Sequence, residues 1–98
     1  MNFREIYGKD HEAVVKSTEE SKSQFISQLM QAVEEQNLTI NDLGIRAGTS
    51  MAATSRMQKP EENITLNSMN RFATVVGKKV DIKLVPNDEL EEPADERL

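Results

Sequence analysis

The 98-residue sequence contains no cysteine and no tryptophan, and it has one histidine, one tyrosine and three phenylalanines. Without cysteine, the chain has neither disulfide bonds nor a thiolate metal site. The single histidine, His11, has no second imidazole with which to form a metal site or a histidine-based catalytic pair. With so few aromatic residues and 37% hydrophobic residues, the composition suits a small helical core and excludes a large sheet buried on both faces.

Long apolar runs are also missing. The first ten residues, MNFREIYGKD, contain no apolar run of signal-peptide length, and no later run is long enough to span a bilayer. These absences predict a cytoplasmic protein. The sequence has no paired catalytic constellation, and a chain of this length is too short for a deep pocket. We therefore expect no enzymatic activity, no cofactor and no metal.

The acidic charge is concentrated at the carboxyl end. The net charge is −5, and residues 87–98 alone carry six acidic side chains against Arg97. Residues 1–22 contain five acids and four bases, whereas residues 23–86 contain six acids and seven bases. The sequence thus predicts an amino-terminal extension over 1–22, a domain over 23–86 and an acidic disordered tail over 87–98. We interpret the tail as a solubility appendage; the alternative is a regulatory role, by competing with DNA or contacting a partner.

The apolar spacing predicts a helix from about Ser21 to Gln36. Its apolar face consists of Phe25, Ile26, Leu29, Met30 and Val33. Upstream, the segment HEAVVK indicates a further short helix capped by Asp10.

Two short helices follow, and capping residues mark their ends. Thr39 and Asp42 have the spacing of a capping box, and such a cap is worth roughly 1 kcal/mol. Gly48 supplies the left-handed residue that ends the second helix. Ser50 caps a third helix, which ends before Pro60.

A fourth helix and a strand complete the domain. Thr65 caps the helix and Gly77 ends it. Beyond Gly77 the apolar period changes to 2, which predicts one β-strand with Val80, Ile82 and Leu84 on one face. Because the backbone groups of one strand need a partner, we expect pairing with the same strand of a second copy. The amino-terminal FREIY is the alternative partner.

The segment LTINDLGIRAGTSMAATSRMQK resembles the phage-repressor and Cro-like (XRE) helix-turn-helix family. The resemblance is carried by Leu38, Thr39, Leu43, Gly48, Ser50, Ser55 and Arg56. The later segment TLNSMNRFATVVGKKVDIKLVP is similar to the fourth helix of the family and the strand after it, as in small HigA-type antitoxins. Over about residues 25–86, the resemblance implies a mainly α, four- to five-helix lambda-repressor-like domain with one carboxyl-terminal β-strand paired across a dimer.

Carried over residue by residue, the resemblance makes 50–58 the recognition helix. It implies base-edge contacts for Ser50, Met51, Ala52 and Arg56. It also implies phosphate contacts for Thr39 and Ile40, and we expect further phosphate contacts from Ser55 and Lys59. The alternatives are a core position for Met51 and an ordinary surface position for Arg56 and Lys59.

Several residues depart from the family pattern. Ile40 stands where glutamine is frequent, and Met51 and Ala52 stand where polar side chains read bases. Thr54 replaces an aliphatic core residue, and Gly44 replaces an alanine, which is expected to cost about 1 kcal/mol of helix stability. With this apolar first turn, the expected code is methyl contacts to thymine plus an Arg56 contact to guanine.

Two functions follow from these features. The first is a dimeric, sequence-specific DNA-binding transcription regulator that represses its own operon or phage and mobile-element genes by binding a double-stranded operator. The second is an antitoxin that neutralises a partner toxin protein and also regulates its own operon. In the second case, residues 1–22 or the acidic tail would bind the toxin.

Overall fold

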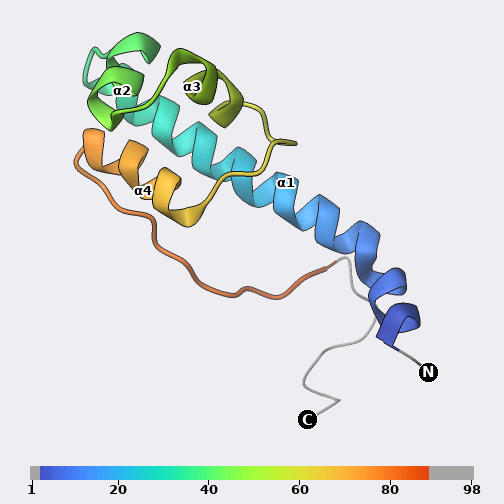
Figure 1. The fold of residues 1–98 in the computed structure, drawn as a ribbon. Coiled ribbons are helices and arrows are strands. Elements are labelled where there is room, and N and C mark those ends of the chain that lie inside the picture. The colour runs from blue at the N-terminus through green and yellow to red at the C-terminus, as the bar shows by residue number, and fades with distance from the viewer. Residues whose placement is uncertain (1–2, 89–98) are drawn as a thin grey trace.

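A computed structural model of the chain describes the backbone of residues 3–88, with side chains from Asp10 onward. Its four helices are α1 (Phe3–Glu35), α2 (Ile40–Ala47), α3 (Met51–Met57) and α4 (Leu66–Val75). Figure 1 shows α2, α3 and α4 gathered beside the carboxyl-terminal part of α1, while the amino-terminal part of α1 projects away from them. The expectation of a mainly α fold is confirmed, with four helices in residues 3–88.

Helix α1 is much longer than the sequence pattern predicts. Its 33 residues correspond to a rod of about 50 Å. The segment HEAVVK lies inside it, so Asp10 is an interior helical residue and the expected cap there is wrong. The helix also runs without a break across the predicted boundary between 22 and 23. Its end agrees with the prediction, because Asn37 adopts a positive φ of 56°.

The core lies where the four helices meet. Its buried residues come from every helix: Leu29, Ala32 and Val33, then Leu43 and Ala47, then Met57, and finally Phe72 and Val76. Phe25, Ile26 and Met30 are partly buried and pack against this cluster. The apolar face predicted for 21–36 is thus confirmed.

The predicted strand is not supported by the structure of the single chain. Residues 78–87 contain no strand, and Figure 1 shows this segment running back toward the projecting part of α1. The backbone amide of Val80 donates to Asn70 Oδ1 at 2.9 Å, and Asn87 Nδ2 donates to Ser17 Oγ at 3.2 Å. The apolar positions Val80, Ile82 and Leu84 therefore have no strand beside them within residues 3–88, and a ladder needs one.

The alternative partner for that strand is excluded. Residues 3–7, the segment FREIY, belong to α1, so they do not have the extended backbone that pairing with a strand requires. Of the predicted tail, residues 87 and 88 belong to the described chain and residues 89–98 lie outside it. Over the described residues, no helix combines the length and the apolar character needed to cross a membrane.

Candidate nucleic-acid interface

The amino-terminal end of α2 is closed by the predicted capping box. Thr39 Oγ1 accepts from the Asp42 amide at 3.0 Å, and Asp42 Oδ2 accepts from the Thr39 amide at 3.0 Å. The hydrogen bond from the Thr39 backbone, followed by the one from its side chain, lowers the pKa of Asp42. This carboxylate occupies the Thr39 amide that a phosphate would otherwise use. The backbone donors that remain in the first turn are those of Ile40 and Asn41.

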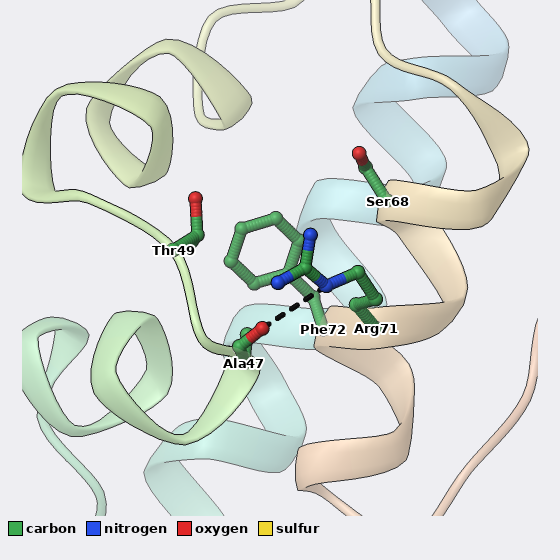
Figure 2. A pocket seen from close by; sticks show the side chains of 5 residues that line it. All are labelled: Ala47, Thr49, Ser68, Arg71 and Phe72. Atoms are coloured by element: carbon green, nitrogen blue, oxygen red, sulfur yellow. Dashed lines mark hydrogen bonds between the residues drawn. The ribbon is translucent and has the colours of Figure 1, made fainter.

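The turn between α2 and α3 consists of residues 48–50. Gly48 has φ 71° and ψ 37°, the left-handed conformation predicted for it. Arg71, from α4, donates its Nε to the Ala47 carbonyl at 3.1 Å and its Nη2 to the Gly48 carbonyl at 2.8 Å. Figure 2 shows this guanidinium lying between α4 and the end of α2. One side chain thus fixes the start of the turn against α4.

The first turn of α3 is capped by Ser50. Its Oγ accepts from the Ala53 amide at 3.1 Å, as predicted. Thr54 and Met57 are buried at 0% and 2% exposure, and they form the inner face of the helix. Thr54 Oγ1 donates to the Ser50 carbonyl at 2.9 Å, so this buried hydroxyl has a hydrogen-bond partner.

The outer face of α3 carries the side chains assigned to DNA. The exposed residues on and beside it are Ser50, Met51, Ala52, Ser55, Arg56 and Lys59. Met51 is 54% exposed, so the alternative that placed it in the core is wrong. Of the phosphate candidates on α2, Thr39 is exposed and Ile40 is half-buried.

Charge on this surface is mixed. Arg56 and Lys59 are followed by Glu61 and Glu62, all four of them exposed. Arg46, in the last turn of α2, adds a further exposed cation. The exposed charges on and near α3 are therefore of both signs, with the two carboxylates following the two cations along the chain.

Two hollows lie on the described part of the chain. The cavity lined by Ala47, Thr49, Ser68, Arg71 and Phe72 has a volume of about 20 Å³, enough for about one water molecule. A larger open groove of about 310 Å³ lies between α1 and Asn87. Among the described residues, no three His, Asp or Glu side chains come together in a way that could hold a metal ion.

Two residues that shape this face were missed by the sequence reasoning. Lys22, on α1, is 5% exposed and contacts the chain just after α3, and Arg71 fixes the turn before it. A signal for Lys22 exists, because it lies three, four and seven residues before Phe25, Ile26 and Leu29, in line with the apolar face of α1. No comparable signal marks Arg71.

Comparison of the chain with protein-family models, with curated proteins and with solved structures finds no match.

Proposed function

We propose that this protein is a sequence-specific DNA-binding transcription regulator of the helix-turn-helix type and that α3 is its recognition helix. The supporting observation is the arrangement of α2 and α3 around the turn 48–50. Thr54 and Met57 anchor α3 in the core, so that its opposite face is free of intramolecular packing. The sequence resemblance to Cro-like repressors supports the same proposal.

The side chains on α3 suit the edges of base pairs in the major groove. Met51 and Ala52 offer apolar contacts for a thymine methyl group, and Ser50 offers a hydroxyl. Arg56 offers a bidentate contact to guanine O6 and N7, and such a pair contributes about 1–3 kcal/mol of discrimination between bases. We therefore propose that base recognition depends on one strong polar contact, from Arg56, together with apolar contacts to thymine methyl groups.

Phosphate contacts would set the position of α3 in the groove. We assign them to Thr39 and Ile40 at the start of α2 and to Ser55 and Lys59 on α3 and after it. Because Asp42 holds the Thr39 amide, the contact at α2 falls to the Ile40 amide and to the outer side of the Thr39 hydroxyl. Among these four proposed phosphate contacts, Lys59 is the one that carries a positive charge to neutralise a phosphate.

A homodimer is part of the proposal. Residues 78–85 present exposed apolar side chains on an unpaired segment, with Ile82 65% exposed and Leu84 99% exposed. Pairing of Val80, Ile82 and Leu84 with the same residues of a second copy would cover them and give a two-fold axis. Two recognition helices would then reach half-sites about 34 Å apart.

An antitoxin is the second candidate, and the projecting part of α1 favours it. Val14 and Val15, in the amino-terminal half of α1, are 45% and 43% exposed. A partner protein would cover them, and residues 1–22 are one of the two segments, with the acidic tail, that this hypothesis expects to bind a toxin. Co-expression with the product of the neighbouring gene tests it: a complex that survives size-exclusion chromatography supports the antitoxin, and two separate peaks contradict it.

The proposed function is tested by in vitro selection of DNA with the full-length protein. We expect an enriched palindromic sequence whose affinity falls steeply as salt rises, because phosphate contacts release counterions. Absence of any enriched sequence, or an affinity that does not change with salt, would overturn the proposal.

A further inference from the structure

The ammonium group of Lys22 lies among backbone carbonyl groups at the end of α3. Its Nζ donates to the Lys59 carbonyl at 2.6 Å, to the Glu62 carbonyl, and to the Arg56 carbonyl at a longer 3.5 Å. These bonds join residue 22 of α1 to residues 34, 37 and 40 positions further along the chain. One side chain thus binds the last turn of α3 and the loop after it.

Apart from the Lys22 contacts, the end of α3 is closed by local bonds: Gln58 Nε2 donates to the Thr54 carbonyl at 3.4 Å, and the Gln58 and Lys59 amides donate to the Ser55 and Arg56 carbonyls. Gln58, its C-cap residue, has φ −77° and ψ −8°, so no left-handed residue closes this end as Gly48 closes α2. The last carbonyl groups of a helix need donors, and a cation there also offsets the negative end of the helix dipole. Lys22 places a cation at this end from a different helix, and it also gives the Lys59 and Glu62 carbonyls a side-chain donor.

The position of Lys22 is well fixed. The side chain is 5% exposed, and α1 is anchored close by through Leu29 and Val33, which are buried in the core. Burial lowers the pKa of Lys22, while Glu62 and Glu61 act in the opposite direction. The ammonium is therefore held by oriented carbonyl groups with carboxylates nearby.

Two of the three carbonyl groups belong to the residues proposed to contact DNA. Arg56 is the proposed guanine reader and Lys59 a proposed phosphate contact, and their backbones are the ones that Lys22 holds. A side chain can read a base only if its backbone has a fixed place relative to the groove, since an error of about 1 Å separates a good contact from a poor one.

We propose that Lys22 is a positioning residue for DNA recognition, which fixes the carboxyl end of α3 so that Arg56 and Lys59 meet DNA in the correct register. This inference rests on the proposed DNA-binding function. Lys22 itself is buried on the inner side and does not contact DNA. Its role is carried by the ammonium group, and not by the volume of the side chain.

The absence of cysteine from the natural sequence allows the ammonium to be removed and restored chemically. The Lys22→Cys variant carries a single thiol, which can be alkylated in denaturant before refolding. Bromoethylamine produces an S-aminoethyl side chain that matches lysine in length and charge, and iodoethane produces a neutral S-ethyl side chain. Each refolded protein is compared by far-UV circular dichroism, by affinity for the selected DNA and by the carbonyl carbon shifts of Arg56, Lys59 and Glu62.

We expect the S-ethyl protein to bind the selected DNA about tenfold more weakly per folded molecule, as the loss of a buried charged hydrogen-bond donor implies. The S-aminoethyl protein should recover the native affinity and the native carbonyl shifts. Equal affinity of the S-ethyl and S-aminoethyl proteins would overturn the positioning role. Failure of the native protein to bind any DNA would instead overturn the proposed function, and the carbonyl shifts would still report on the Lys22 contacts.

A measurement on the unsubstituted protein covers the case in which the neutral variant does not fold. Lysine ammonium protons that are buried and hydrogen-bonded exchange slowly with water and give a nitrogen-correlated NMR signal. We expect one such signal, from Lys22, and we expect it to persist in the DNA complex. A Lys22 ammonium that exchanges as fast as the exposed lysines would contradict the proposal.

Discussion

A Cβ atom added to Gly44 would lie 2.6 Å from Thr54 Oγ1, closer than any ordinary van der Waals contact. Thr54 is fully buried, and its hydroxyl is held by the hydrogen bond to the Ser50 carbonyl, so it cannot turn away at low cost. The glycine at position 44 and the threonine at position 54 are thus one structural feature. Gly44 gives α2 room to approach the threonine on α3.

The first prediction is whether the Gly44→Ala substitution raises or lowers the free energy of unfolding. Helix propensity alone would make this change stabilising by about 1 kcal/mol. The contact with Thr54 makes it an overpacking change, which destabilises by about 1–3 kcal/mol. We expect net destabilisation, measured as the free energy of unfolding in urea.

A double-mutant cycle isolates the cause. Thr54→Ala removes the hydroxyl, so Gly44→Ala should destabilise the Thr54→Ala background far less than the native protein, or stabilise it. Additive effects of the two substitutions, or a stabilising Gly44→Ala in the native background, would show that the contact does not govern this position.

The second prediction concerns the hydrogen bonds by which Arg71 clamps the turn between α2 and α3. Arg71→Ala removes the donors to the Ala47 and Gly48 carbonyls, and we expect a loss of about 1–2 kcal/mol, since the arginine is exposed and its bonds are partly screened. Arg56→Ala is the matched control, because it also removes an exposed arginine but no helix-end contact, and it should change stability by less than about 0.5 kcal/mol. Equal thermal unfolding midpoints for the two variants would argue against the clamp.

The third prediction is a pH dependence that arises from Asp42. Its pKa is lowered in the folded chain, so folding favours the carboxylate. The stabilisation is fully present above the ordinary aspartate pKa of about 3.9 and is lost as the pH falls through the lowered value. The native protein should therefore exceed Asp42→Asn in stability at neutral pH, and the difference should vanish in acid. A difference that stays constant with pH would exclude this role for the carboxylate.

The fourth prediction tests the proposed dimer. Ile82→Asp places a charge in the exposed segment 78–85 and should convert a dimer to a monomer in sedimentation equilibrium. Leu66→Asp is the matched control, since Leu66 is a 48% exposed apolar residue outside that segment. A native protein that is already monomeric, or an Ile82→Asp protein that stays dimeric, would exclude pairing through this segment.

Capping residues in the sequence correctly predicted where α2, α3 and α4 begin and where α2 ends. Thr39, Gly48, Ser50 and Thr65 fix helix ends through bonds within four residues or through their own backbone conformation, so the sequence alone places them. The length of α1 was missed because the apolar residues of its first half, Phe3, Ile6, Tyr7 and Val14, form only an interrupted stripe. The strand was predicted from alternation, but alternation says nothing about whether a partner is present in the same chain.

The parts of the candidate site that escaped prediction depend on long-range contacts. Lys22 and Arg71 act on carbonyl groups 23 to 40 residues away, and such pairings are set by how the helices pack. The same holds for Gly44, whose cost was estimated from helix propensity alone. Only the packing of α2 on α3 reveals the contact with Thr54.

The central claim is that the outer face of α3 reads DNA through Arg56, and the specificity ratio tests it most directly. This ratio compares affinity for the selected sequence with affinity for a scrambled one, by fluorescence anisotropy at fixed salt. We expect Arg56→Ala to lower affinity for the selected DNA by about 5- to 100-fold and to lower the ratio, with less effect on scrambled DNA. Lys16→Ala, which removes one exposed positive charge from the amino-terminal half of α1, should leave the ratio unchanged. An Arg56→Ala protein with the native ratio would contradict the account.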